Sequence, residues 1–339
     1  MHNDKLMKYD KKVMLTGDRP TGRLHLGHYA GSLKTRLKHQ DEYKCFIMVA
    51  DVQALTDNFN NPEKVRSNVF EVVVDNLSVG IDPSKVIYFI QSEISAIAEL
   101  TVFFSNLVTV SELQRNPTVK NEIQEKGQIF KDGVVNLGFL SYPVSQSADI
   151  AFCKAHVVPV GKDQKPMIEQ ARRIYKKFNT LYGEVFVMPM GVFSDIPKLN
   201  GLDGRKMSKS LDNAIYLSDS EDEVRSKIMS AKTDLDNTIR YDEENKPNIS
   251  NLIMYYQVVS GMTIKEIEKK YSDLKSYKIF KEDLVETINT FLKPIREKRK
   301  YYMNNPNIVW NLLKEGGKIA SSVGEKTVDE VKEVMKIKY

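Results

Sequence analysis

Short, continuous apolar runs alternate with amphipathic segments up to about residue 217 of this 339-residue chain. The runs are rich in β-branched residues, and the segments between them carry apolar residues at helical spacing. Strands that are apolar on both faces and separated by helices indicate a parallel sheet covered on both sides. We therefore predict an α/β domain with strands at residues 12–17, 45–51, 85–91, 156–161 and 185–193.

The clearest helix signal lies in residues 61–80. Asn61 can cap the N-terminus, Pro62 fits the first turn, and Gly80 can close the helix. The apolar positions repeat at helical spacing and share one face, which the helix should bury. These positions are Val65, Val69, Val72, Val73 and Leu77.

The pattern changes after residue 217, where the strand signal stops. Three pairs have the spacing of a capping box and predict helix starts, namely Ser220 with Glu223, Thr263 with Glu266, and Thr327 with Glu330. We predict an α/β domain over 1–204, a mobile loop over 205–216 and an all-helical domain over 217–339.

Length and composition exclude several classes of protein. The length suggests about two domains, and a net charge of +5 permits contact with nucleic acid without requiring it. Two distant cysteines, Cys45 and Cys153, provide neither a disulfide framework nor a four-ligand metal site, and only five histidines are present. The N-terminus is polar and no apolar run reaches membrane-spanning length. We expect a soluble cytoplasmic protein with two reduced, buried thiols and no metal centre of its own.

A glycine-rich segment, GDRPTGRLHLGHYAGSL, follows the first predicted strand. His25 and His28 are three residues apart, so both imidazoles should lie on one side of a first helical turn. Glycines such as Gly27 allow a ligand to approach the backbone, and a helix N-terminus at the end of a parallel strand suits phosphate. The alternative to a ligand site is that one histidine is a surface residue and the other is packed in the core. The combination of two histidines, several glycines and a strand-to-helix junction disfavours this alternative.

A second segment, GLDGRKMSKSLDN, concentrates cations on a flexible stretch. Arg205, Lys206 and Lys209 surround Met207, and Ser208 and Ser210 fill the gaps. By itself this stretch fits a solvated loop and a phosphate-binding loop about equally well.

The two segments together resemble the signature motifs of class I aminoacyl-tRNA synthetases. The stretches VADVQALTDN, SYPVSQSADIAF, VVPVGKDQKPMIEQARRI and GRKMSKSLDNAIYL are similar to those of bacterial tryptophanyl-tRNA synthetases. The resemblance spans about residues 12–220 and extends more weakly beyond. It implies a Rossmann-like catalytic domain, then an all-helical domain that binds the tRNA anticodon. It also implies activation of L-tryptophan with ATP and Mg²⁺, release of pyrophosphate, and transfer of tryptophan to the 3′ end of tRNA(Trp).

The resemblance assigns the two segments to ATP. It implies that His25 and His28 contact the phosphates while Gly27 leaves room for the nucleotide. Lys206 and Lys209 would meet the leaving pyrophosphate, with Ser208 and Ser210 assisting and Met207 anchoring the loop. Lys120, in ELQRNPTVKNEI, matches a lysine that reaches the phosphates, and a solvated helix lysine is an equal alternative.

The resemblance also assigns the amino-acid pocket. Asp149 would accept the indole N–H, Tyr142 would line the pocket, and Gln146 stands where many members have methionine. A buried acceptor suits indole, which has one donor and no acceptor. A capping or surface role is the alternative for Asp149.

Further residues of the pocket depart in part from the family pattern. Gln164 would hold the amino-acid backbone, and the adjacent Asp163 would orient ATP. Asp18 stands where many members have glutamine, and Lys162 replaces an acidic residue.

The helical part would carry the tRNA contacts, and the resemblance implies a homodimer. Residues 293–302, KPIREKRKYY, interleave cations with aromatics, which fits RNA and a solvated helix end equally well. Trp310 has apolar neighbours at helical spacing and is predicted to be core. The rival functions are a tyrosine–tRNA ligase, a smaller nucleotidyltransferase of the same superfamily, and a non-catalytic RNA-binding paralogue.

Overall fold

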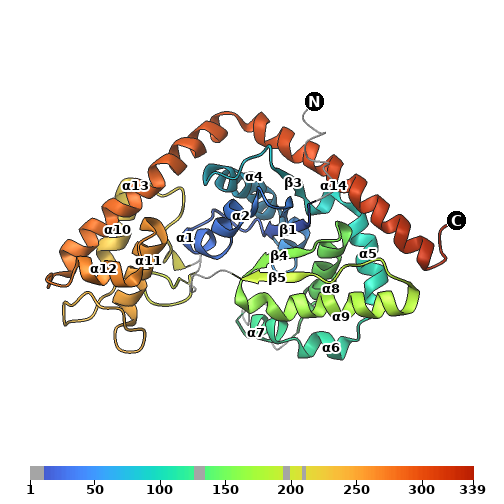
Figure 1. Ribbon diagram of the computed structural model, residues 1–339, viewed down its shortest axis with the longest axis horizontal. Helices are drawn as coiled ribbons and strands as arrows, with labels where there is room; N and C mark the ends of the chain where they lie inside the picture. Colours follow the sequence, from blue (N-terminus) through green and yellow to red (C-terminus); the bar gives the residue numbers. More distant parts are fainter. Residues whose placement is uncertain (1–10, 126–133, 194–198, 208–210) are drawn as a thin grey trace.

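A computed structural model describes residues 11–125, 134–193, 199–207 and 211–339. Its five parallel strands are ordered β3-β2-β1-β4-β5 (Figure 1). They are β1 Val13–Asp18, β2 Lys44–Val49, β3 Val86–Ile90, β4 Val157–Val160 and β5 Met190–Phe193. All five predicted strands are therefore present, although the fifth covers only Met190–Phe193 of the run 185–193.

Strand order reverses beside β1, which has β2 on one side and β4 on the other. In open α/β sheets, ligands bind at such a switch point, outside the carboxyl ends of the strands. The N-terminal helices are α1 Leu26–His28, α2 Lys34–His39, α3 Asp51–Leu55, α4 Pro62–Ser78, α5 Ser95–Ser105, α6 Val110–Arg115, α7 Pro117–Glu125, α8 Leu137–Phe152 and α9 Lys165–Tyr182. A π-helical turn, η1 Tyr29–Leu33, joins α1 to α2, and short 3₁₀ turns lie at η2 Gln91–Glu93 and η4 Lys162–Gln164.

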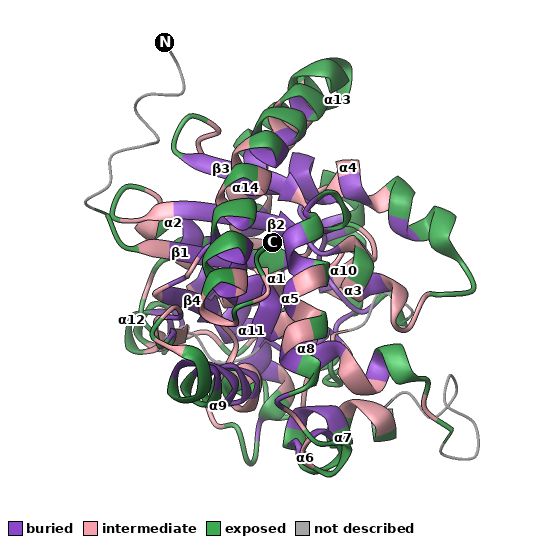
Figure 2. Cartoon of the chain, turned by 90° about the vertical axis from the view of Figure 1, so that its right-hand side faces the viewer, coloured by how far each residue is buried: buried purple, intermediate pink, exposed green. Residues whose placement is uncertain are grey.

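Strands β1 to β4 supply side chains to two apolar cores, one on either face of the sheet. Met14 and Ile47 pack in the core that includes α4 and much of the helical part. Leu15 and Phe46 pack in the core that includes α5, α8 and α9. Figure 2 shows β1 to β4 largely buried between these helices. Cys45 and Cys153 lie buried in the two cores as free thiols, as expected.

Helix α4 forms as its sequence predicts. The Asn61 side chain accepts a hydrogen bond from the Lys64 N–H at 3.2 Å, and Pro62 is the first helical residue. The five predicted core residues of this helix are all buried.

The helical part comprises α10 Glu221–Ser230, α11 Pro247–Ser260, α12 Ile264–Lys270, α13 Tyr277–Asn304 and α14 Pro306–Val334. The capping boxes of Ser220 and Thr263 are confirmed. The third prediction is wrong, because Thr327 lies inside α14 and its hydroxyl donates to the Phe152 carbonyl at 2.8 Å.

The last helix, α14, crosses back over the sheet domain and packs on β3 and α5 (Figures 1 and 2). It buries small residues, Gly316, Ala320 and Gly324. Trp310 was predicted to lie in the core, and this prediction is wrong. The small residues form the face of α14 that packs on the sheet domain, and the indole is left 44% exposed and stacked on Phe70.

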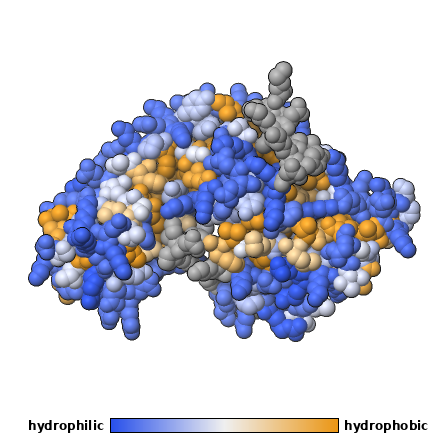
Figure 3. Space-filling view, viewed as in Figure 1, coloured by the Kyte–Doolittle hydropathy of each residue, from blue (hydrophilic) through white to orange (hydrophobic). Residues whose placement is uncertain are grey.

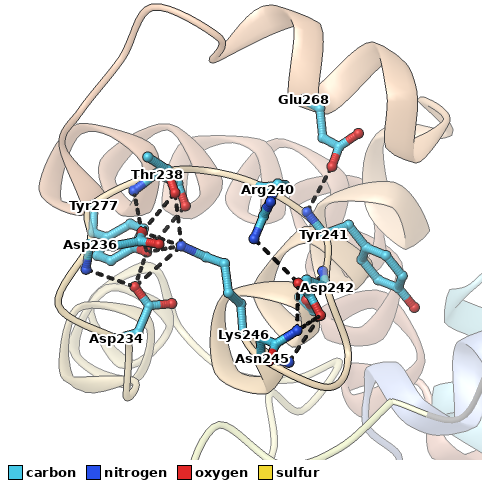
Figure 4. Close-up of polar contacts among 11 residues, drawn as sticks. Asp234, Asp236, Thr238, Arg240, Tyr241, Asp242, Asn245, Lys246, Glu268 and Tyr277 are labelled. Carbon is cyan, nitrogen blue, oxygen red and sulfur yellow. Dashed lines mark hydrogen bonds and ion pairs between the residues drawn. The ribbon is translucent and has the colours of Figure 1, made fainter.

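A buried lysine organises the loop between α10 and α11 (Figure 4). Lys246 is 3% exposed, and its ammonium contacts the carboxylates of Asp234 and Asp236. It also lies 2.9 Å from the Thr238 hydroxyl and 3.0 Å from the Tyr277 hydroxyl. One charge therefore holds the loop against α13.

Replacing Lys246 with methionine is expected to lower the free energy of unfolding by about 2 kcal/mol, because the polar groups around it lose their donor. Denaturant unfolding measures this change. Lys318→Met is the matched control, since Lys318 pairs with Glu315 on the surface and should change stability by less than about 0.5 kcal/mol. Equal effects of the two substitutions would contradict the role given to Lys246.

Candidate active site

The two histidines lie where the chain passes from β1 into α1. Their ring centroids are 3.9 Å apart, and the His25 N–H donates to Nδ1 of His28 at 3.2 Å. Leu26 between them is fully buried and fixes the turn in the core. The structure therefore brings both imidazoles together at the carboxyl edge of the sheet, as predicted.

The segment after the cationic loop runs beside these histidines. The Leu26 N–H donates to the Ile215 carbonyl at 2.9 Å, and the Leu217 N–H donates to the Leu24 carbonyl at 3.0 Å. His25 forms an antiparallel bridge with Tyr216. Two segments about 190 positions apart in the printed sequence are thus held together by backbone hydrogen bonds.

Met207 joins the two motifs directly. A Cβ atom built on Gly27 would lie 2.8 Å from the Met207 sulfur and 2.9 Å from Nδ1 of His25, so any larger residue there would displace one of these side chains. Lys206 next to Met207 is exposed. The predicted residues Ser208, Lys209 and Ser210 lie outside the described residues.

Helix α11 holds the base of the cationic loop. The Asn251 side chain accepts the Asn200 N–H at 3.1 Å and donates to the Gly201 carbonyl at 3.1 Å. The Tyr255 hydroxyl donates to the Asn200 carbonyl at 3.0 Å. Sequence reasoning missed Asn251 and Tyr255, and no local pattern distinguishes them from other residues of an amphipathic helix.

Asp149 and Gln146 line a cavity of about 100 Å³ at the switch point, together with residues of β1, β2 and β4. Asp149 is 2% exposed, and one of its carboxylate oxygens accepts a hydrogen bond from Nε2 of Gln91 at 2.7 Å. The other oxygen, and Oε1 of Gln146, are buried without a partner among the described residues. Two unpaired acceptors in one cavity fit a ligand that brings N–H donors.

Burial raises the pKa of the Asp149 carboxyl to about 7. The hydrogen bond from Gln91 opposes this shift, and the negative charge of Asp51 adds to it. A carboxyl group perturbed in this way within a cavity is typical of a functional site.

Tyr142 lies outside the lining of that cavity. Its side chain is 5% exposed, packs on Phe139, and borders a neighbouring groove with Val52 and Phe59. Gln53 borders both spaces.

Asp18, the last residue of β1, belongs to a buried hydrogen-bond network. Its carboxylate accepts hydrogen bonds from Arg36 at 2.9 Å and from Asn76 at 3.0 Å. Burial raises the pKa of Asp18, but the charge and hydrogen bonds of Arg36, with Asn76, outweigh it and lower the pKa overall. This carboxylate is therefore already paired within the protein.

The other predicted residues gather near the end of β4. Gln164 donates from Nε2 to the Asp163 carboxylate at 3.2 Å in the turn η4. The Thr118 hydroxyl donates to the Asp163 carbonyl at 3.0 Å, which joins α7 to this turn. Lys120, two residues further along α7, is exposed.

Gln91 and Arg36 are the polar partners that sequence reasoning missed. Gln91 ends the predicted strand 85–91, and a polar residue at the carboxyl end of a buried strand was the available signal. Arg36 gave no signal, because a lone arginine in a helix is usually exposed.

Comparisons with known proteins agree with the resemblance. A family model described as tRNA synthetases class I (W and Y) matches residues 7–293. The tryptophan–tRNA ligase of Clostridium longisporum is 47% identical, over 97% of this chain and 98% of that protein.

Two solved structures share the fold over nearly the whole chain. Tryptophanyl-tRNA synthetase of Mycoplasma pneumoniae matches with a TM-score of 0.85 and 27% identity, over 97% of this chain and 98% of that one. The enzyme of Campylobacter jejuni, complexed with ADP and tryptophan, matches with a TM-score of 0.81 and 30% identity, over 96% and 99%. The predicted α/β fold with a parallel sheet followed by helices is confirmed. This chain therefore belongs to the class I aminoacyl-tRNA synthetases of the tryptophan and tyrosine family, within the bacterial tryptophanyl group.

Proposed function

We propose that this protein is a tryptophan–tRNA ligase. It joins the carboxylate of L-tryptophan to the α-phosphate of ATP, releases pyrophosphate, and transfers tryptophan to the 3′ end of tRNA(Trp). The observation that carries this assignment is the buried, unpaired oxygen of Asp149 in the cavity at the switch point. The 47% identical Clostridium longisporum ligase supports it.

The chemistry of Asp149 favours tryptophan over tyrosine and phenylalanine. The indole N–H can donate to the free carboxylate oxygen, whereas phenylalanine leaves that oxygen buried and unpaired. Sites built around such a buried polar contact reject ligands that lack the matching group.

The contact between Met207 and Gly27 supports a phosphate site formed by both motifs. His25 and His28 donate hydrogen bonds to ATP phosphates, and Lys206 and Lys209 stabilise the negative charge that develops on pyrophosphate. Gly27, Ser208, Ser210, Lys120 and Asp163 complete the nucleotide contacts. Gln146 acts beside Asp149 in the amino-acid pocket, and Tyr142 acts from the neighbouring groove, which Gln53 shares with that cavity. Gln164 holds the amino-acid backbone, and Asp18 acts through its network with Arg36.

Mg²⁺ enters with ATP as part of the substrate. Among the described residues, no group of three His, Cys, Asp or Glu side chains is arranged to hold a metal ion. The side chains assigned to the ATP phosphates are cations and imidazoles and not carboxylates. This fits a Mg²⁺ ion that is held through phosphate oxygens and water.

The remaining partners follow from the same assignment. We propose that the catalytic domain comprises residues 1–204, that residues 205–216 carry the second motif, and that the anticodon binds within residues 217–339. The groove beside Tyr142 is bordered by Val52 and Phe59, which are 44% and 59% exposed, and exposed apolar side chains of this kind support a homodimer. The described residues include no helix that is both long and apolar enough to span a bilayer. The use of tRNA as a substrate supports a cytoplasmic location.

The assignment is tested by ATP–pyrophosphate exchange, with Mg²⁺ and each of the twenty amino acids in turn. Exchange with tryptophan alone is the expected result. Exchange with tyrosine alone would keep the reaction but reject the pocket assignment. No exchange from folded protein would favour the RNA-binding paralogue instead.

Replacing Lys209 with alanine is expected to lower the activation rate about tenfold while tryptophan affinity stays unchanged, because its cation acts on the leaving pyrophosphate. Single-turnover activation and equilibrium tryptophan binding measure the two quantities. A loss of affinity at an unchanged rate would contradict this role.

Tryptophan affinity is expected to rise with pH between about 5.5 and 7.5, because binding favours the ionised carboxylate of Asp149. Its pKa of about 7 in the free protein means that binding near neutral pH releases a proton. Calorimetry in buffers of different ionisation enthalpy measures this release. Asp149→Asn removes the titrating group and should abolish both effects, and proton uptake on binding would show that the sign is wrong.

The same raised pKa affects the stability of the free protein. In the folded protein the pKa of Asp149 lies above the ordinary value of 3.8, because burial favours the protonated carboxyl. The contribution of Asp149 to stability is therefore fully present below pH 3.8 and is lost as the pH rises through about 7.

A further inference from the structure

Helix α13 runs from the helical part to the sheet domain, and its second half packs on α4. Near its end, Arg299 donates to the Asp75 carboxylate at 3.0 Å and also pairs with Glu71. Asp75 is fully buried. Its other oxygen accepts the backbone N–H of Leu24 at 2.7 Å.

Leu24 immediately precedes His25 in the sequence. Asp75 therefore links a charged side chain of α13 to the backbone that carries the first of the two histidines. Both oxygens of this buried carboxylate bond to segments outside α4.

Two more contacts bring α13 against the same region. The Phe291 ring packs edge-on against Tyr29, at 4.9 Å between centroids, in the turn that follows His28. Arg296 donates to the Asp219 carbonyl at 2.9 Å, and the Asp219 carboxylate accepts the Tyr216 N–H at 2.9 Å. Tyr216 is the residue that bridges to His25.

The basic run 293–302 thus has a use that neither sequence interpretation anticipated. Arg296 and Arg299 are 19% and 12% exposed, so they are neither a solvated helix end nor a free surface for RNA. Arg299 connects α13 to Asp75, which binds the residue before His25. Arg296 connects α13 to Asp219, which binds the residue that bridges to His25.

We propose that Asp75 is a positioning residue that couples α13, through Arg299, to the placement of His25 and His28 against ATP. Leu24 cannot shift without breaking its hydrogen bond to Asp75, and Asp75 cannot follow it without leaving Arg299. The helical domain and the phosphate-contacting turn therefore move as one unit. This inference rests on the proposed function for its readout of exchange kinetics, while ATP affinity tests it separately.

The test compares Arg299→Met and Asp75→Asn with the unaltered chain. The kcat for exchange, the KM for ATP and the Kd for tryptophan are measured, and ATP affinity is measured directly by calorimetry. Either variant should lower kcat/KM for ATP about tenfold, because small displacements of reacting groups are costly. Tryptophan affinity should stay within about twofold, since Asp149 is untouched.

Three further variants separate positioning from mere stability. Arg299→Lys keeps a cation beside Asp75 and should recover most of the ATP parameters, even if Arg299→Met folds poorly. The double variant Asp75→Asn with Arg299→Met should be no worse than the more severe single variant, since both act through one contact. Arg240→Met is the matched control, because Arg240 is 63% exposed and pairs with Asp242 on the surface.

Two results would overturn the inference. One is unchanged ATP affinity and kinetics in Arg299→Met and Asp75→Asn with a lowered melting temperature, which indicates a structural role alone. The other is an equal loss of tryptophan and ATP affinity. If the unaltered chain shows no exchange, the proposed function fails, and the direct ATP affinities of the same variants still decide this inference.

Discussion

Alanine in place of Asp149 is expected to lower the kcat/KM preference for tryptophan over phenylalanine about 100-fold. The carboxylate oxygen that faces the cavity has no partner among the described residues, so the indole N–H supplies its missing hydrogen bond. Alanine removes both the acceptor and the penalty that an apolar ring suffers beside it. Exchange rates with the two amino acids, measured over a range of concentrations, give the ratio.

Asp149→Asn provides a graded control in the same position. Asparagine offers one acceptor oxygen to two donors, the Gln91 amide and the ligand N–H, so its preference for tryptophan should lie between those of aspartate and alanine. An unchanged preference in both variants would remove Asp149 from the pocket.

Replacing Gly316 with alanine is expected to destabilise the protein by about 3 kcal/mol or more. Gly316 lies where α14 crosses β3, and a Cβ atom there would overlap the backbone carbonyl of Tyr88. Since β3 is held in place by its pairing with β2, the helix must lift away from it and lose apolar contacts. Denaturant unfolding, followed by circular dichroism, measures the loss.

The neighbouring residue provides the matched control for this substitution. A Cβ atom on Gly317 would meet only the carboxylate of Glu93, at 3.0 Å, which can rotate away. Gly317→Ala should therefore change stability by less than about 1 kcal/mol. Equal losses at the two positions would show that the crossing with β3 does not determine the cost, since helix propensity favours alanine at both.

The local sequence pattern was sufficient to predict a strand or helix wherever that element's own residues determine its structure. The five strands formed where continuous apolar runs predicted them, because such runs can be buried only in the interior of a covered sheet. Helix α4 begins at Pro62 behind its Asn61 cap, because the capping hydrogen bond needs only residues three apart.

Local pattern failed where packing overrides it. Thr327 and Glu330 have capping-box spacing, yet α14 continues through them because its buried face lies on α5 and α8. Trp310 has core-like neighbours, yet the stripe of small residues faces the sheet and turns the indole outward. Which face of a helix is buried depends on the partner surface, and the helix sequence alone does not contain that surface.

The chain by itself determined the strands, the first turn that carries His25 and His28, and the chemical character of the cationic loop. Only the tertiary structure decided which groups meet. Gln91 reaches Asp149 across 58 positions, and Arg299 reaches Asp75 across 224. A hydrogen bond depends on distances of about 3 Å and on direction, and over such separations these are set by how the sheet and helices pack together.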